Sequence, residues 1–265
     1  MWVADSGTTA GRPDRSGVRR RAPNDPGQYD DLAAEWWRPD GAFAVLHWLA
    51  EARAGLIPPA TRPGAVLVDL GCGGGLLAPH VAGKGYRHVG VDLVRSGLDQ
   101  AAAHGVAAVQ GDATAVPLAD GCADVVSAGE LLEHVPDWRA AVAEACRLLR
   151  PGGTLVLDTL NATALSRLLA VRVAERLPGV PRGIHDPGLF VDSAALVAQC
   201  ARHGVPLRVR GIRPAVGPAL RWLARRAAGA SGRAGAGAVR SAGRPRVVPT
   251  WSTAVLYQGW GVRVG

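Results

Sequence analysis

The sequence is poor in several residue types that carry common functions. Its 265 residues include four cysteines, 5% aromatic residues and no CxxC pair, which disfavours both a zinc ribbon and a disulfide framework. No apolar run reaches the ~18–20 residues that a membrane-spanning helix needs. Residues 1–26 contain arginines but no apolar segment, so we expect no secretory signal and a reduced, cytoplasmic setting.

Acidic residues are outnumbered by basic ones, with 22 Asp+Glu against 30 Lys+Arg and a formal net charge of +8. Because Lys84 is the single lysine, this charge is almost entirely arginine. The arginines gather in residues 12–21 and 221–246, two stretches rich in Gly, Ala, Ser and Pro that bury little apolar surface. Two interpretations stay open: solvated segments, or contact with an anionic partner such as nucleic acid or phospholipid.

Hydrophobic residues make up 48% of the chain, which is enough for a full core. The length suits one α/β domain with appendages. We interpret residues 1–27 as a disordered, arginine-rich tail and residues 28–265 as one folded domain. Within that domain, residues 224–249 read as a flexible Gly/Ala/Arg-rich insertion.

Strand and helix patterns alternate from residue 65 onward. Predicted strands lie at 65–70, 88–92, 107–110, 123–128 and 154–159, with helices over 76–83, 96–103 and 138–149 between them. Two more strands, 205–212 and 251–258, are expected to close the sheet. This alternation predicts an α/β fold with a mostly parallel seven-stranded sheet and helices on both faces. Residues 29–57, interrupted at 39–41, predict two helices that form an N-terminal lid.

A glycine-rich loop follows the first predicted strand. The run from Asp69 to Gly75 (DLGCGGG) opens a helix, and its glycines allow the backbone to approach a ligand closely or to take positive φ. Such a loop alone is compatible with NAD, FAD or a tight turn. Asp92 ends the second strand about 20 residues later, where a carboxylate can accept both hydroxyls of an adenosine ribose.

Other residues favour S-adenosylmethionine (SAM) over a dinucleotide. Asp69 precedes the first glycine, where its carboxylate can face an ammonium group, and Asp112 ends the third strand, where it can accept from an adenine amino group. A Pro-Gly-Gly turn at 151–153 precedes the fifth strand. The set resembles the motifs of class I SAM-dependent methyltransferases, which implies a Rossmann-like fold. The expected cofactor residues in these motifs are Asp69, Gly71, Gly73, Asp92 and Asp112.

Segments outside these motifs resemble a narrower family, the UbiG-like O-methyltransferases of ubiquinone biosynthesis. The similar runs are 29–37 (YDDLAAEWW), 130–137 (ELLEHVPD), 158–161 (DTLN) and 183–186 (GIHD). The resemblance implies methyl transfer to a phenolic acceptor, a catechol or polyprenyl-phenol such as 3-demethylubiquinol. It also implies SAM contacts at Arg53, Gly71 and Asp92, and it places Gly129 where the family commonly has methionine beside the adenine.

Three residues that follow the fourth strand are the candidates for catalysis. Glu130, Glu133 and His134 lie at the carboxyl edge of the sheet, where ligands bind. The resemblance implies that all three are Mg²⁺ ligands, and two carboxylates with an imidazole suit a divalent ion that a catechol can also coordinate. Alternatively, Glu130 and His134 act without a metal, with His134 as the general base, and His47 and His185 are the next candidates for that role.

Residues 164–177 predict either an interfacial helix or a helix packed over the site. One side carries Leu165, Leu169, Val173 and Leu177, bordered by Arg172 and Arg176. That pattern suits peripheral contact with anionic lipid at the inner face of a membrane.

Two other functions stay open. One is methylation of a different natural product at carbon or nitrogen. The other, which we disfavour, is methylation of nucleic acid, because the chain has no Asn/Asp-Pro-Pro-aromatic motif and no recognisable RNA-binding module. The sequence leaves the oligomeric state open.

Overall fold

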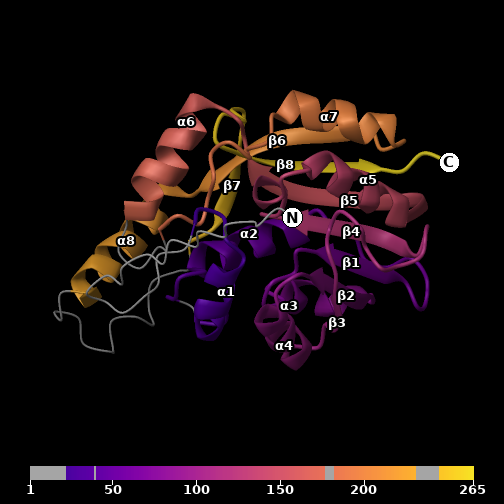
Figure 1. The fold of residues 1–265 in the computed structure, drawn as a ribbon, viewed down its shortest axis with the longest axis horizontal. Coiled ribbons are helices and arrows are strands. Elements are labelled where there is room, and N and C mark those ends of the chain that lie inside the picture. The colour runs from indigo at the N-terminus through magenta and orange to yellow at the C-terminus, as the bar shows by residue number, and fades with distance from the viewer. Residues whose placement is uncertain (1–21, 39, 177–181, 231–244) are drawn as a thin grey trace, which may run out of the picture.

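The computed structural model describes residues 22–38, 40–176, 182–230 and 245–265 (Figure 1). Its strands form one eight-stranded sheet in the order β3-β2-β1-β4-β5-β8-β6-β7. Their bounds are β1 Val66–Leu70, β2 Arg87–Asp92, β3 Ala107–Gln110, β4 Ala123–Gly129, β5 Leu149–Leu160, β6 Leu207–Pro214, β7 Val247–Thr250 and β8 Leu256–Val262. The strands β1 to β5 pair in parallel, whereas β8 is antiparallel to both β5 and β6. This confirms the predicted α/β fold and mostly parallel sheet.

The strand order places a binding crevice at the centre of the sheet. The chain moves outward from β1 to β2 and β3, then returns to the other side of β1 with β4 and β5. In such sheets ligands bind beyond the carboxyl ends of the strands, where the direction of winding reverses. Here that point lies between the ends of β1 and β4, at Leu70 and Gly129.

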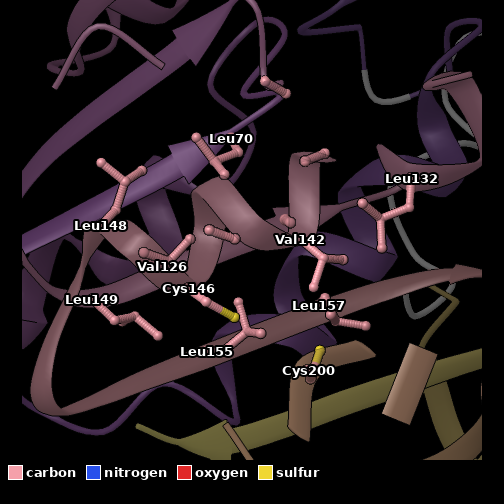
Figure 2. Packing of buried hydrophobic residues seen from close by; sticks show 14 of the residues in the cluster. Leu70, Val126, Leu132, Val142, Cys146, Leu148, Leu149, Leu155, Leu157 and Cys200 are labelled. Atoms are coloured by element: carbon pink, nitrogen blue, oxygen red, sulfur yellow. The ribbon is translucent and has the colours of Figure 1, made fainter. Parts of the chain in front are cut away.

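Alternate residues of the central strands enter two cores, one on each face of the sheet. Val126 and Leu155 face the helices α5 (Trp138–Leu148) and α7 (Ser193–Arg202), and Figure 2 shows Cys146, Leu155 and Cys200 in this core. Their neighbours Val125 and Val156 face the opposite side. There they pack with residues of α2 (Ala44–Ala54) and α3 (Ala78–Val81). Because both faces are covered, the middle of each of these strands is a run of buried, mostly apolar residues rather than an alternation of apolar and polar ones.

The remaining helices lie around the sheet (Figure 1). They are α1 Gly27–Asp31, the 3₁₀ turns at Ala33–Glu35 and Ala82–Lys84, α4 Arg95–Ala103, the short helical turn Leu132–His134, α6 Ala164–Arg167 and α8 Val216–Ala230. The helix predicted over 164–177 is α6 continued by a π-helical segment, Leu168–Val173, and a 3₁₀ turn, Ala174–Arg176. Leu177 lies outside the described residues. No helix in the described part of the chain is long and apolar enough to cross a membrane.

The sheet has eight strands, so the prediction of seven was wrong by one. The prediction of a flexible insertion over 224–249 was also wrong at both of its ends. Residues 224–230 continue helix α8, and Val247–Thr250 forms β7 against β6. The two β-branched residues at 247 and 248 extend the sheet edge, while Trp222 packs α8 against Trp48 of α2. Residues 231–244, the rest of the predicted insertion, lie outside the described residues.

Other boundaries also differ from the prediction, among them the start of β5, which is Leu149 rather than residue 154. The last strand begins at Leu256 rather than at 251, because the carbonyls of Thr253 and Ala254 accept hydrogen bonds from Asn161 and Thr163 instead of pairing in the sheet. Residues 22–27 belong to the predicted tail, yet Asn24 and its neighbours are fixed by hydrogen bonds to the site. Residues 1–21 lie outside the described residues.

Candidate active site

The seven residues predicted to bind SAM line one cavity of about 700 Å³. They come from the lid helix α2, the end of β1 and the loop after it, and the ends of β2, β3 and β4. The residues are Arg53, Asp69, Gly71, Gly73, Asp92, Asp112 and Gly129. The structure therefore brings together all of the predicted cofactor residues, although they span 77 positions of the sequence.

Asp92 joins the glycine loop to the end of β2. Its Oδ2 accepts a hydrogen bond from the backbone N–H of Gly73 at 2.8 Å, and its Oδ1 accepts one from Val94 at the same distance. Burial raises the pKa of this carboxyl, although the backbone donors oppose the shift. Each oxygen keeps a second lone pair, so the carboxylate can still accept from ribose hydroxyls.

The lid lies directly on the glycine loop. A Cβ added at Gly73 would come within 2.4 Å of the Trp36 ring, so this position has no room for a side chain. Trp36 is buried and stacks on Phe43 with ring centroids 4.0 Å apart, and the indole N–H of Trp37 donates to the carbonyl of Gly74. From the sequence, these two tryptophans could either cap the site as an aromatic lid or only pack the N-terminal helix on the sheet, and the structure places both of them against the glycine loop.

Asp69 and Asp112 occupy opposite environments in the cavity. Asp69 is buried, with its Oδ2 3.7 Å from Nε2 of His88. Asp112 is exposed, and its Oδ1 accepts from both the backbone N–H and the hydroxyl of Thr114 at 2.8 Å. A buried carboxylate suits a charged ammonium group, whereas an exposed one at the rim suits an amino group of an aromatic ring.

Arg53 takes the space that Gly129 leaves empty. Its Nη1 donates to Oδ1 of Asp158 at 2.7 Å, and both side chains are buried. A Cβ at Gly129 would lie 1.7 Å from that same nitrogen. The resemblance implies that the family commonly has methionine at position 129. In this chain the Arg53 guanidinium lies instead against the Gly129 backbone.

Glu133 is buried and Glu130 is half-buried, and the two carboxyl groups have different surroundings. Glu130 has a positive φ of 50°, and its Oε1 has no hydrogen-bond partner among the described residues. Burial, with Glu133 and Asp158 nearby, raises the pKa of Glu130 well above its usual range. Glu133 accepts from the Thr159 hydroxyl at 2.8 Å, and burial raises its pKa to about 7.

His134 is fixed by two residues of the N-terminal segment. Its Nδ1 lies 2.6 Å from Oδ1 of Asn24, whose amide nitrogen donates to the His134 carbonyl at 2.8 Å. This arrangement makes Nδ1 the protonated nitrogen and leaves Nε2 as an acceptor, 3.4 Å from the Tyr29 hydroxyl. Burial, reinforced by His185, lowers the pKa of His134 to about 3, so the ring is neutral at pH 7.

A second imidazole, His185, lies parallel to the first. The two ring centroids are 5.3 Å apart, and both rings line the cavity. Glu175 accepts from the backbone N–H of Gly183 at 2.8 Å and lies 3.3 Å from Nδ1 of His185, which orients this ring. His47 does not line the cavity; its Nε2 lies 2.9 Å from the Trp36 carbonyl.

The three predicted Mg²⁺ ligands do not form a ligand set in this structure. Among the described residues, no group of three or more His, Cys, Asp or Glu side chains is placed to hold one metal ion. Glu133 is directed at Thr159, and both ring nitrogens of His134 have neighbours in Asn24 and Tyr29. As these residues lie, they do not fit a divalent ion.

Sequence reasoning missed Asn24, Tyr29, Glu175 and Trp222. The first two fall next to or within the predicted tail, and nothing in their spacing connects them to His134, about 110 positions later. Glu175 lies in the segment 164–177, which the sequence analysis interpreted only from its apolar side chains and arginines. Trp222 lines the cavity from α8, a helix that the composition of its surroundings did not indicate.

Comparison with known proteins identifies the family to which this chain belongs. Residues 68–157 match the model of a methyltransferase domain. The ubiquinone biosynthesis O-methyltransferase of Idiomarina loihiensis is 37% identical over 185 residues, which cover 66% of this chain and 76% of that protein. Its counterpart in Bordetella bronchiseptica is 36% identical over 196 residues, covering 70% and 81%. The chain belongs to the ubiquinone biosynthesis O-methyltransferase family. It is a SAM-dependent O-methyltransferase.

Solved structures agree on the fold. A SAM-dependent methyltransferase of Thermotoga maritima superposes with a TM-score of 0.59 at 16% identity, over 89% of this chain and 96% of that one. An N-methyltransferase of Haemonchus contortus, solved with S-adenosylhomocysteine, superposes with a TM-score of 0.56 at 16% identity, over 89% and 60%. These similarities confirm the Rossmann-like methyltransferase fold predicted for this family member.

Proposed function

We propose that this O-methyltransferase methylates a phenolic hydroxyl of a small molecule, a catechol or a polyprenyl-phenol, as in the methylation of 3-demethylubiquinol. The names of its relatives support a quinol acceptor. The observation that carries the proposal is that the glycine loop and the paired imidazoles of His134 and His185 open into one cavity. The same cavity is lined by apolar side chains of α2, among them Leu46 and Leu49, which suit an aromatic ring with an apolar substituent.

The cofactor end of the cavity would be formed by the seven residues predicted for it. Asp92 would accept from the ribose hydroxyls, Asp69 would face the ammonium group and Asp112 the adenine amino group. SAM, when bound, supplies a methyl group on a positively charged sulfur. Burial of Arg53 and Asp69 excludes water around it, which strengthens every charged contact there.

His134 is the proposed general base. A phenol has a pKa near ~10, so it is protonated at pH 7 and needs an acceptor for its proton. The His134 ring offers Nε2 as an acceptor, and the position of the Tyr29 hydroxyl, 3.4 Å from this nitrogen, supports the placement of a phenol near it. Glu130 has an unpartnered buried oxygen on the same cavity, which suits a hydrogen bond to the second hydroxyl of a catechol.

Mg²⁺ remains a prediction of the sequence. Because Glu130, Glu133 and His134 do not converge on a common point, no step of the proposed reaction is assigned to a metal.

Peripheral contact with lipid is proposed for the segment 164–176. Its side chains Leu165, Leu168, Leu169 and Val173 are between 38% and 46% exposed, whereas Ala170 on the opposite side is buried. Such a row of exposed leucines is uncommon on a surface that faces only water. Contact with a membrane would let the tail of an isoprenoid acceptor stay in the bilayer while its head group enters the cavity.

The reaction can be tested with methyl-labelled SAM and quinol analogues with and without an isoprenoid chain. The expected product is an aryl methyl ether, formed at a rate that falls at least ~100-fold in His134→Ala, within the usual range for loss of a general base. A label found on carbon or nitrogen would contradict the proposal, and so would full activity of the His134→Ala variant.

A further inference from the structure

Helix α8 contributes a tryptophan to the cavity, although none of the residues predicted to bind SAM lies on this helix. Trp222 lines the cavity and is half-buried. Its ring meets that of Trp48 on α2 edge-on, with centroids 5.0 Å apart and an angle of 87° between the planes. Trp48 is buried, so α8 packs on the lid through this pair of indoles.

Arg226 fixes the Trp222 ring from a second direction. It lies one turn later on α8, with its guanidinium carbon 5.0 Å from the centroid of the Trp222 ring. Its Nη1 donates to the carbonyls of Asp40 and Gly41 at 2.6 Å and 3.1 Å. These carbonyls precede α2, so the same arginine joins α8 to the lid and holds the indole at the cavity wall.

Trp222 lies beside a row of α2 residues that leads away from the cofactor end. Val45, Leu49 and Arg53 are spaced four residues apart, so they lie on one side of α2, and all three line the cavity. The helix rises about 12 Å between Val45 and Arg53. Because Trp48 precedes Leu49, Trp222 meets α2 beside the apolar part of this row and not at Arg53.

The cavity is charged on one side and apolar on the other. The acidic residues that line it come from the ends of β1 to β4 and from the loops that follow these strands. On the other side α2 and α8 contribute Val45, Leu46, Leu49 and Trp222. A polar substituent placed against this wall would lose its water and gain no hydrogen-bond partner from these side chains, whereas an apolar one would be buried favourably.

The size of the cavity limits how much of an acceptor this wall can contact. A volume of about 700 Å³ lies within the range of ~300–1,000 Å³ that is usual for a single drug-sized ligand. SAM would occupy much of that space. The remainder suits an aromatic ring and the first few carbons of a substituent, so a longer chain has to leave the cavity.

We propose that Trp222 is a specificity-determining residue for the acceptor. Together with Val45 and Leu49 it forms an apolar subsite for the first carbons of an alkyl or prenyl substituent on the phenolic ring. The phenolic ring itself rests on the proposed function, whereas the subsite rests on the position of Trp222 and on the apolar wall that it completes.

The alternative is that Trp222 only fastens α8 to the lid. In that case a smaller side chain would lower turnover of every acceptor by the same factor, because it would change only the fraction of protein that is correctly folded. A residue that contacts the substituent changes the ratio between acceptors instead. The test therefore compares acceptors within each variant.

A series of catechols with no substituent or with a 4-methyl, 4-ethyl, 4-propyl or 4-butyl group measures this ratio. With methyl-labelled SAM, kcat/KM of the wild type should rise about fourfold for each carbon that becomes buried. In Trp222→Ala the rise should fall below about twofold per carbon, because the new side chain leaves the subsite open to water. Trp222→Phe keeps an aromatic ring and should recover part of the rise.

The matched control is Trp251→Ala, which makes the same truncation at a fully exposed tryptophan that does not line the cavity. It should keep the wild-type rise with chain length. Thermal unfolding shows whether each variant is folded, and Trp222→Leu replaces Trp222→Ala in the series if the latter does not fold. A rise with chain length that is equal in the wild type and in the folded Trp222 variant would overturn the proposal.

A polar isostere tests the apolar character of the subsite. In the wild type, 4-(2-hydroxyethyl)catechol should be at least ~10-fold poorer than 4-propylcatechol, because its hydroxyl would be buried without a partner. The two compounds differ little in size, so equal kcat/KM values would contradict an apolar subsite at Trp222.

Calorimetric binding of the same catechols in the presence of S-adenosylhomocysteine separates this proposal from the proposed function. If the enzyme methylates none of them but binds them more tightly with each carbon, in a way that Trp222→Ala abolishes, the subsite stands and the proposed reaction is wrong. If it methylates them with a chain-length dependence that Trp222→Ala leaves intact, the subsite is wrong and the proposed reaction stands. If it neither methylates nor binds them, both are wrong.

Discussion

Asn24 holds His134 by both its ring and its backbone, through contacts of 2.6 Å to Nδ1 and 2.8 Å from the amide nitrogen to the carbonyl oxygen. Asn24 also has a positive φ of 60°, and its N–H donates to the carbonyl of Gly183 at 3.0 Å. One residue of the N-terminal segment therefore links the two loops that carry His134 and His185. It also determines which nitrogen of His134 is free to accept a proton.

Replacing Asn24 should lower kcat without changing the affinity for SAM. In Asn24→Ala, Nδ1 of His134 loses its acceptor, so the ring can take the other tautomer or rotate. We expect kcat to fall about 10-fold or more, since loss of a hydrogen bond to a buried group costs ~1–3 kcal/mol. Calorimetric affinity for SAM should change less than twofold. Asn24→Asp keeps the acceptor oxygen and should recover part of the rate, whereas an unchanged kcat in Asn24→Ala would show that Asn24 does not position His134.

Asp92→Ala should weaken SAM binding by about 10- to 100-fold. A hydrogen bond to a charged group contributes ~1.5–3 kcal/mol, and each 1.4 kcal/mol is tenfold in affinity. The variant also frees the Gly73 N–H that the carboxylate fixes, so the loop loses its tie to β2. Asp112→Ala is the comparison, because that carboxylate is exposed and accepts its hydrogen bonds from Thr114 in the part of the chain that the structure describes; its effect should be smaller. Equal losses in both variants would argue against ribose binding by Asp92.

Gly129→Met should destabilise the fold even though methionine is common at this position in the family. The new side chain would displace the Arg53 guanidinium, and Asp158 would be left buried without its partner. Breaking a buried ion pair costs about 3–5 kcal/mol, which urea unfolding can measure. Gly83→Ala is the control, since a Cβ there meets nothing within 4 Å. If Gly129→Met unfolded with the wild-type free energy, the Arg53 guanidinium would have to adopt another position in which it is still paired.

The sequence predicted those parts of the molecule that depend on local pattern. The strand–helix alternation, the glycine loop and the carboxylates at the strand ends follow from periodicity and from the carboxyl-edge rule for parallel sheets. It could not predict contacts made by side chains far apart in the chain. Asn24 meets His134, and Arg53 fills the space over Gly129, because folding brings them together rather than because of any spacing. At β7 the composition led to the wrong prediction of a flexible insertion, because two valines beside an arginine-rich stretch were enough to extend the sheet.

Mg²⁺ should not bind to this protein in the absence of an acceptor. Glu133 is held by Thr159 and His134 by Asn24, so a divalent ion would have to break both contacts to gather its ligands. Calorimetric titration should show no Mg²⁺ binding below ~1 mM, and EDTA should leave the affinity for SAM unchanged. Micromolar binding that is abolished in Glu133→Gln would contradict this expectation and show that the three side chains rearrange around the ion.

Glu133 should make the fold less stable as the pH rises through neutrality. Burial raises its pKa from 4.5 to about 7, so between these values the folded protein holds a proton that the unfolded chain has released. The contribution to stability is therefore complete below about pH 4.5 and is lost as the pH approaches 7.

His134 has the opposite effect: its pKa is lowered from 6.5 to about 3, so its contribution to stability increases with pH between those values. Urea unfolding of wild type and Glu133→Gln between pH 5 and pH 8 separates the two, because the variant keeps His134. The free-energy difference between wild type and variant should shift in favour of Glu133→Gln with increasing pH, and a difference that stays constant over this range would show that Glu133 is ionised in the folded protein throughout.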